Sequence, residues 1–455
     1  MIRKKAKSIK KLFSNSSLRS KKVIINIIGL TGVKIIDVLI GIFMVPLSIE
    51  YLGQNEYGIW LTLTSMVLWF NFFNGGLGHG LRNKLAENIA IGDFKKAKQY
   101  VSLTYFILVS ISLSLLLFFI IIYNEINWQS WLNTKIISNH TLGILGIVVF
   151  GSFALQLSLN LIQTILSANQ QPAKGQLINL VGKTIIFVGL IFAIKMDTKS
   201  ILIYGMIYSF GTVFVLLIAT FLLFYKDFRN IAPSLKSVNF TLFRDIGGLS
   251  IKFFIIQISI AVLFTSDNFI IAQLFTPNEV TPYQIAHKYF ALVLMSFAVI
   301  MRPMWSAITD AYVLKEMDWI RNTVIKLLKI WVALIFVIIL MLFVSKPIYE
   351  LWVGEDIIIS YTLSLGWALF VILQMLNMIF TYFLNGIGKV KIQVYTAILS
   401  LLINIPLSIF FAKTLNLGTA GVIFATNISI LIYVIFRSIQ YTKIINGKAN
   451  GIWDK

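Results

Sequence analysis

The chain has 455 residues, of which 58% are apolar and only 13% are charged, whereas soluble proteins average about 25% charged residues. This composition excludes an ordinary water-soluble protein and indicates that lipid surrounds most of the chain. Cysteine is absent, which excludes disulfide bonds, thiolate metal sites and cysteine nucleophiles.

About twelve membrane-spanning helices are predicted, because stretches of about 20 apolar residues recur along the whole sequence. The first six cover residues 23–47, 57–78, 101–122, 141–168, 174–194 and 200–224. The next six cover residues 246–274, 283–309, 323–345, 357–384, 391–412 and 418–440. Between the second and third, the segment 81–98 is too polar to span the membrane. Its apolar residues recur at helical spacing, which fits a helix on the inner surface and an ordinary soluble connecting helix equally well.

A net charge of +21 is typical of nucleic-acid binding but also of a membrane protein with basic cytoplasmic loops. The positions of the basic residues along the chain distinguish the two. With both termini in the cytoplasm, the inner segments hold 30 Lys and Arg residues and the outer loops hold five. This asymmetry follows the positive-inside rule and predicts a multi-pass membrane protein in that orientation. The same charges would lie against anionic headgroups, so membrane lipids are predicted partners and nucleic acid is not.

A weak internal repeat divides the predicted helices into two halves. Residues Leu166–Asn169 with Lys174 are similar to Leu384–Gly386 with Lys391. An even number of spans lies between the matching residues of the two halves. The two halves would therefore have the same orientation in the membrane. The repeat predicts two six-helix lobes around a central cavity. The predicted divisions are a basic cytoplasmic N-terminal segment (1–22), a first lobe (23–224), a cytoplasmic linker (225–245), a second lobe (246–440) and a cytoplasmic tail (441–455).

Ionisable residues inside the predicted spans are informative, because a charge in hydrocarbon is costly unless it has a partner or faces water. Lys34 and Asp37 lie three residues apart in the first helix, so a self-contained ion pair and a transport role explain them equally well. Lys183 lies midway along the fifth helix with no acidic residue nearby in sequence. A cation facing a cavity is favoured for Lys183 over an ion pair with Asp37 or Asp267.

Two further charged residues lie in the seventh and eighth predicted helices. Asp267 belongs to a polar cluster, Thr265–Asn268, and two interpretations stay open: a protonatable coupling site or a structural partner for a lysine. Lys288 follows His287 near the start of its helix. A functional role and simple extension towards the membrane surface both fit Lys288.

Catalytic and cofactor signals are missing from the sequence. There is no GxxxxGK(S/T), HExxH or GxSxG pattern, so an ATPase, a zinc protease and a serine hydrolase find no support. A membrane glycosyltransferase or polymerase would need paired acids on a large outer loop, but the longest predicted outer loop covers only residues 123–140. The three histidines are scattered and suit no metal. We expect a protein that is not an enzyme and uses no cofactor.

Several stretches resemble a known family. Residues 51–60 (YLGQNEYGIW) and 75–88 (GGLGHGLRNKLAEN) are similar to the first two helices of bacterial polysaccharide flippases of the O-antigen type. Residues 267–271 (DNFII) and 283–288 (YQIAHK) resemble the seventh and eighth helices of that family. The resemblance spans nearly the whole chain and extends to the larger multidrug, oligosaccharidyl-lipid and polysaccharide (MOP) exporter superfamily.

The resemblance implies a flippase of the bacterial inner (plasma) membrane whose two lobes alternate between inward-open and outward-open forms. It would move an oligosaccharide repeat unit of O-antigen or another surface polysaccharide, linked to undecaprenyl pyrophosphate, from the cytoplasmic to the outer leaflet. Lys34, Lys183 and Lys288 are the candidate cations for the pyrophosphate, which carries about two negative charges. Asp37 and Asp267 are the candidates for coupling transport to H+ or Na+. Polysaccharide polymerase and chain-length machinery are the implied protein partners.

A small-molecule exporter of the same superfamily, which exchanges a cation for a drug, is the alternative. Its substrates are often cationic, so acids would dominate its cavity. The most central residue without an expected partner, Lys183, is instead basic. The sequence therefore favours a substrate with an anionic headgroup.

Overall fold

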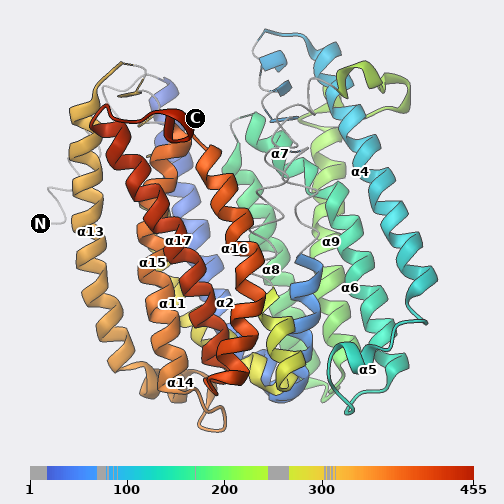
Figure 1. Cartoon of the computed structure of the whole chain (residues 1–455). Helices are drawn as coiled ribbons and strands as arrows, with labels where there is room; N and C mark the ends of the chain where they lie inside the picture. The colour runs from blue at the N-terminus through green and yellow to red at the C-terminus, as the bar shows by residue number, and fades with distance from the viewer. Residues whose placement is uncertain are drawn as a thin grey trace, which may run out of the picture. The chain divides into compact units, whose positions relative to one another are not determined.

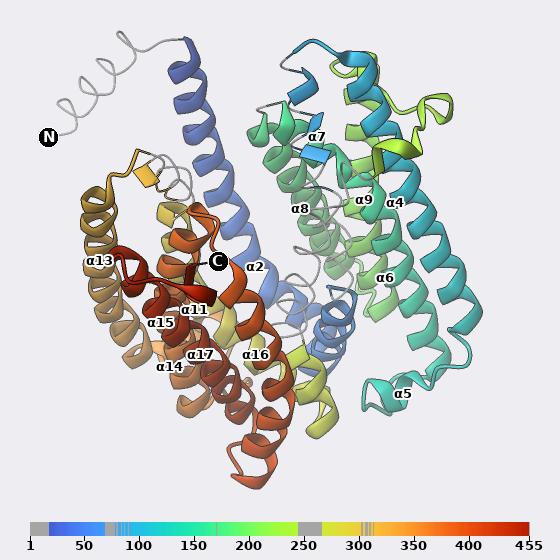
Figure 2. The same ribbon diagram turned by 45° about the horizontal axis from the view of Figure 1, so that its top comes forward.

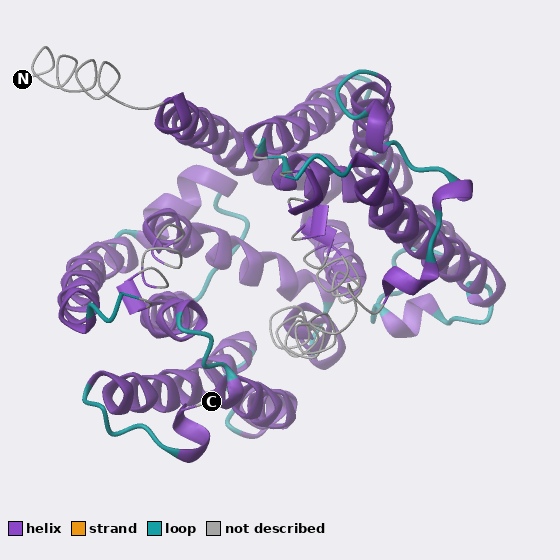
Figure 3. Cartoon of the chain, turned by 90° about the horizontal axis from the view of Figure 1, so that it is seen from above, coloured by secondary structure: helices purple, strands orange, loops and turns teal. Residues whose placement is uncertain are grey.

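Helices are the regular elements of the part of the chain that the structure describes (Figure 3). The computed structural model describes residues 18–68, 78, 81–82, 84–85, 87–89, 91–169, 171–243, 266–301, 304, 308, 311–312 and 314–454, the side chains of residues 18–31 and 68 excepted. No strand occurs among these residues, in agreement with the predicted all-α class. Most of the predicted N-terminal segment (1–22) and residues 246–265 of the predicted seventh span lie outside the described residues.

Ten helices among the described residues are long and apolar enough to cross a membrane. They are α2 (Leu18–Leu68), α4 (Phe94–Ile122), α6 (Asn139–Leu159) continued by α7 (Leu161–Ala168), α8 (Pro172–Lys195), α9 (Ile201–Tyr225), α11 (Val280–Met301), α13 (Met317–Phe343), α15 (Tyr361–Gly386), α16 (Lys391–Ile409) and α17 (Thr419–Ile445) (Figure 1). Two short helices, α5 (Trp128–Trp131) and α14 (Ser345–Val353), lie between spans. The first two predicted spans both fall on α2, and the seventh is described only at helical residues 266–274. The prediction of about twelve spans therefore agrees with the structure.

Helix α2 contains a break at Gly53, whose φ of 73° and ψ of 168° are not helical. A positive φ of this kind is readily adopted by glycine, which has no Cβ to clash with the backbone. The break separates a long first span from residues 54–68, which contain the start of the second predicted span at residue 57. One glycine thus divides α2 between the two predicted spans, 23–47 and 57–78.

The contacts of the chain divide it into two compact units. Unit 1 holds the described parts of Met1–Tyr51, Phe73–Asn124 and Ile144–Ile251, and unit 2 holds those of Leu52–Phe72, Glu125–Gly143 and Lys252–Lys455. Residues 52–72 and 125–143 thus group with the C-terminal half of the chain, although the repeat assigned them to the first lobe. The two six-helix lobes and the cavity between them stay predictions.

Hydrogen bonds account for this grouping. The Thr281 hydroxyl donates to the main-chain oxygen of Gln54 at 2.7 Å, which holds the start of the second span against α11. The Asn133 amide donates to the main-chain oxygen of Phe275 at 2.7 Å, which holds the segment 125–143 against the end of the helical residues 266–274. Both segments therefore pack with the C-terminal half.

The prediction of one continuous helix over 81–98 is wrong. A turn at residues 91–92, where Gly92 has a φ of 80°, interrupts it. Asp93 then caps α4, because its carboxylate accepts a hydrogen bond from the main-chain N–H of Lys96 at 2.9 Å. An acidic cap of this kind satisfies an N–H that has no partner inside the helix. One helix therefore ends and the next begins inside the predicted segment.

Each unit has a core of its own. In unit 1, buried side chains of α4, α7 and α9 pack with the segment after α9, and they include Tyr100, Leu103, Ile165, Leu216 and Ile231. In unit 2, α15 packs against α11, α13 and α17, and α16 packs against α17 (Figure 2). Large apolar side chains such as Phe343 on α13, which is 73% exposed, cover outward faces, as helices surrounded by lipid require.

Candidate functional site

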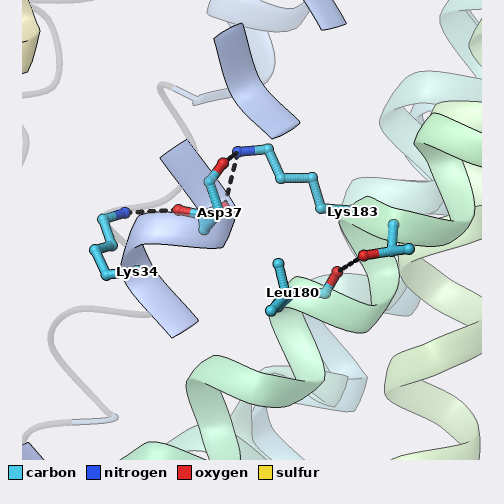
Figure 4. A network of polar contacts seen from close by, with 5 residues as sticks. Lys34, Asp37, Leu180 and Lys183 are labelled. Atoms are coloured by element: carbon cyan, nitrogen blue, oxygen red, sulfur yellow. Dashed lines mark hydrogen bonds and ion pairs between the residues drawn. The ribbon is translucent and has the colours of Figure 1, made fainter. Parts of the chain in front are cut away.

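Three charged side chains meet inside the spans of unit 1 (Figure 4). The Lys34 ammonium lies 2.7 Å from Oδ2 of Asp37, and both residues come from α2. The Lys183 ammonium of α8 lies 2.7 Å from the other oxygen, Oδ1, of the same carboxylate. One aspartate therefore holds two lysines, one on each oxygen.

The backbone of α2 helps to hold Lys183. The Lys183 Nζ also donates to the main-chain oxygen of Asp37 at 2.6 Å. One turn further along α2, a Cβ at Gly41 would lie 3.0 Å from Nζ of Lys183, which is closer than side chains normally pack. The absence of a side chain at Gly41 thus opens the surface of α2 to the ammonium group.

The electrostatic balance of this cluster leaves one positive charge in excess. Two ammonium groups face one carboxylate, and among the described residues no other acid lies within ion-pair distance of either lysine. The side chains of Lys34, Asp37 and Lys183 are 40%, 27% and 29% exposed. Because they are only partly covered, their donors remain accessible to an anion. An anionic group is the ligand that an excess of positive charge favours.

The structure shows which ion pairs these residues form, while their transport role stays a prediction. Lys34 and Asp37 do form a close pair within one helix, as their spacing allows. For Lys183, the less favoured interpretation, an ion pair with Asp37, is present in the structure across 146 positions of sequence, and its role as a cation that faces a cavity stays a prediction. Sequence proximity could not reveal a partner on another helix.

Asp267 lies in a different environment, inside unit 2. Its side chain is buried, with 4% exposure, and its Oδ2 accepts hydrogen bonds from the Tyr283 hydroxyl at 2.6 Å and the Thr426 hydroxyl at 3.4 Å. Its Oδ1 has no hydrogen-bond partner among the described residues. No lysine of the described residues contacts the Asp267 carboxylate, so the interpretation of Asp267 as the partner of a lysine finds no support among them.

Uncharged polar groups extend this site into α16 and α17. The Asn404 amide donates to the Thr426 hydroxyl at 3.1 Å and to the Ser429 hydroxyl at 3.4 Å. The amide oxygen of Asn404, like Oδ1 of Asp267, is buried and has no hydrogen-bond partner in the described part of the chain. Buried acceptors are normally satisfied, so these two oxygens, which have no partner among the described residues and are connected through Thr426, are candidate ligands for a proton or a cation. The sequence analysis missed these residues, although Thr426 and Ser429 share a helical face.

Lys288 belongs to unit 2 and has an aromatic neighbour. Its ammonium donates to the Tyr57 hydroxyl at 2.8 Å and lies 5.5 Å from the centre of the Tyr57 ring. The adjacent His287 ring stacks on Trp367 with centroids 4.4 Å apart. Lys288 therefore belongs to another unit than the Lys34 and Lys183 cluster, and its predicted role stays a prediction.

A buried arginine was also missed. Arg437 of α17 is 7% exposed, and its guanidinium donates to the side-chain oxygens of Asn377 and Thr381 on α15 at 2.6 and 2.5 Å. It also lies 4.6 Å from the centre of the Tyr433 ring. A planar guanidinium can bind two acceptors and stack on a ring at once, so Arg437 connects α15 to α17.

Comparisons with known proteins agree with the predicted resemblance. The MatE family model matches residues 253–410. A candidate O-antigen export protein of Yersinia pseudotuberculosis is 22% identical over 382 residues, covering 79% of this chain and 82% of that protein. A candidate O-antigen transporter of Salmonella typhi is 23% identical over 291 residues, covering 63% of this chain and 64% of that protein.

Solved structures share the fold at low sequence identity. An inward-facing multidrug resistance MATE family transporter of the MOP superfamily aligns with a TM-score of 0.71 and 14% identity, covering 90% of this chain and 96% of that chain. The lipid II flippase MurJ, in an inward closed conformation, aligns with a TM-score of 0.69 and 16% identity, covering 91% of this chain and 87% of that one. Together with the matched family model, these likenesses confirm the resemblance to the MOP superfamily.

Proposed function

We propose that this protein is a flippase that carries an oligosaccharide linked to undecaprenyl pyrophosphate from the cytoplasmic to the outer leaflet by alternating access. The observation that carries the proposal is the cluster of Lys34, Asp37 and Lys183, which has two ammonium groups for one carboxylate. The two relatives from Yersinia pseudotuberculosis and Salmonella typhi are named for O-antigen export and transport. Both features favour an anionic, sugar-bearing substrate.

The chemistry of the cluster suits a pyrophosphate headgroup. In this proposal, phosphate oxygens compete with the Asp37 carboxylate for the ammonium groups of Lys34 and Lys183, because charge-assisted hydrogen bonds to phosphate are strong. Asp37 holds the two donors near each other while no substrate is bound. Lys288 supplies a further cation in unit 2. The lipid tail of the substrate stays in the bilayer, where its transfer costs little.

Asp267 is the proposed coupling site. Its Oδ1 and the amide oxygen of Asn404, neither of which has a hydrogen-bond partner among the residues that the structure describes, are the kinds of atom that bind H+ or a hard cation such as Na+. Asp37 is the second candidate, because it exchanges partners when the phosphate binds. A gradient of either ion would then drive the return of the empty carrier.

The proposed location is the inner membrane with both termini in the cytoplasm, as the distribution of 30 inner and five outer basic residues supports. There the protein would supply repeat units to polysaccharide polymerase and chain-length machinery. In this role it transports without catalysing a reaction.

A multidrug cation antiporter is the second candidate, favoured by the structural likeness to a MATE family transporter. A cationic substrate would meet the surplus positive charge of Lys34 and Lys183 and be repelled by it. The sign of the charge at this cluster therefore favours the flippase.

Substitution of the two lysines tests the proposal. We expect Lys34→Gln and Lys183→Gln each to lower the rate of surface-polysaccharide assembly about tenfold or more, since a hydrogen bond to a charged group contributes about 1.5–3 kcal/mol. Lys195→Gln, at the exposed end of the same helix α8, is the matched control and should have no effect. Normal assembly by the double variant at normal expression would rule out the phosphate-binding role.

A further inference from the structure

The segment that follows α9 has two chemically different faces. Residues 226–243, here called the strap, contain three short 3-10 turns, η2 (Arg229–Ile231), η3 (Leu235–Ser237) and η4 (Phe240–Leu242). Phe228, Ile231 and Leu242 are buried in the core of unit 1. The strap is therefore a fixed part of unit 1 instead of a free linker.

Two contacts define the depth of the strap along α4. The main-chain N–H of Ser234 donates to the Ser102 hydroxyl at 3.0 Å, and the Phe240 ring packs edge-on against Phe106 with centroids 5.6 Å apart. The apolar run of α4 begins at residue 101. At 1.5 Å per helical residue, Phe106 lies about 7 Å inside that run. The strap therefore lies at the depth where headgroups meet acyl chains.

The outer face of the strap is apolar at this depth. Leu235 is 81% exposed, Phe240 is 62% exposed and Phe243 is 50% exposed. Three large apolar side chains beside the end of a membrane span are costly in water, whereas they are favourable in the upper acyl region. A helix or loop that inserts about 5–10 Å into this region is the usual arrangement for interfacial segments.

The strap also carries three basic side chains. Lys226, Arg229 and Lys236 are exposed, and the acid of the strap, Asp227, pairs with Lys174 of α8 at 3.0 Å. The three exposed cations are thus not neutralised within the strap. Basic groups at the membrane surface attract anionic headgroups with about 1 kcal/mol each.

We propose that the strap is an interfacial anchor that inserts Leu235, Phe240 and Phe243 into the acyl boundary and binds anionic phospholipid through Lys226, Arg229 and Lys236. The depth of insertion follows from the contacts with α4, and only the assignment to the cytoplasmic leaflet rests on the orientation proposed above. The anchor binds bilayer lipid outside the transport site. Its occupant is lipid instead of a soluble protein, because the exposed apolar groups lie at membrane depth.

The first test measures insertion. Because the chain contains no cysteine, Leu235→Cys and Phe240→Cys each provide a single site for a fluorescent label in the full-length protein, reconstituted in vesicles of phosphatidylcholine and phosphatidylglycerol. We expect nitroxide on the upper acyl chain to quench both labels and aqueous iodide to quench neither. A label at the exposed Lys448, after the end of α17, should respond to iodide. Iodide quenching of the two strap labels would overturn the proposal.

The second test measures lipid selectivity and involves no transport, so its result is independent of the proposed function. Arg229→Gln with Lys236→Gln should weaken binding of phosphatidylglycerol by about fivefold for each charge removed. Lys346→Gln with Lys413→Gln, which removes the same charge from predicted outer loops, is the matched control. Equal retention of phosphatidylglycerol by the two double variants would rule out the anionic site.

Discussion

The two aspartates inside the spans have opposite surroundings. In unit 1, the partly exposed Asp37 contacts two ammonium groups at 2.7 Å. In unit 2, Asp267 is 4% exposed and contacts only the hydroxyls of Tyr283 and Thr426 among the described residues. Two residues of one type, both in apolar sequence, therefore have different chemistry.

The difference suggests a division of roles. A carboxylate surrounded by ammonium groups stabilises a surplus of positive charge, which attracts an anion. A buried carboxylate with a free oxygen has no charged partner to balance it, so it can gain one by binding a proton or a metal cation. The first environment suits substrate binding, and the second suits coupling. The following changes test this contrast.

The largest effect is expected from Asp267→Asn. The amide keeps the shape of the side chain and can still accept from Tyr283, but it cannot bind a cation with the charge of a carboxylate. We expect ion-driven transport of the lipid-linked oligosaccharide in vesicles to fall about tenfold or more, with substrate binding retained. Asp356→Asn in an exposed loop is the control. Full gradient-driven transport by Asp267→Asn would contradict the coupling role.

Removal of the other carboxylate should mainly reduce stability. Asp37→Asn leaves the ammonium groups of Lys34 and Lys183 together without a counter-charge. Because these side chains are partly exposed and screened, we expect a loss of about 1 kcal/mol. Adding Lys183→Gln returns the cluster to a single positive charge.

Thermal unfolding in detergent measures both variants. The midpoint should fall for Asp37→Asn and rise again for the double variant, while transport stays low because one phosphate donor is missing. If the second substitution lowers the midpoint further, repulsion between the lysines is not the cause.

A smaller effect is expected from a change that leaves every charge in place. A side chain at Gly41 would lie 3.0 Å from Nζ of Lys183, so Gly41→Val should push the ammonium away from Asp37 and lower transport several-fold. Gly32→Val on the same helix is the matched control, because nothing lies within 4 Å of a Cβ there. Equal activity of the two variants would mean that the exact position of Lys183 is unimportant.

The smallest effect is expected at an ion pair outside the spans. Burial opposes the charge of Lys389, but its ion pair with Asp454 and its contact with Tyr312 raise the pKa of Lys389 above its ordinary value. Because the pKa of Lys389 is raised in the folded protein, its ion pair stabilises the fold at every pH below the ordinary lysine pKa of about 10.4. This stabilisation is lost as the pH rises through the raised pKa of Lys389. We expect Asp454→Asn to cost less than about 1 kcal/mol.

Unfolding midpoints measured from neutral to alkaline pH test this last expectation. The difference between Asp454→Asn and the unchanged protein should be constant near neutral pH and should shrink above the ordinary pKa of lysine. A difference that grows with pH would show that the ion pair is not its source.

The sequence by itself determined the class of the fold and the closeness of Lys34 and Asp37. A bilayer requires long apolar helices, so hydropathy identifies them, and two residues three positions apart on a helix are always neighbours. These features depend on residues close together in the chain.

Only the tertiary structure decided which side chains meet between helices. Lys183 reaches Asp37 because α2 and α8 pack at one particular rotation and depth, and Gly41 leaves the necessary space. Thr426 reaches Asp267 in the same way, from a position 159 residues away. Hydropathy fixes neither the rotation of a helix about its axis nor its depth beside a neighbour, because both result from the packing of side chains. The sequence could therefore name Asp37 and Asp267 only as possible partners of Lys183, and the structure decided between them.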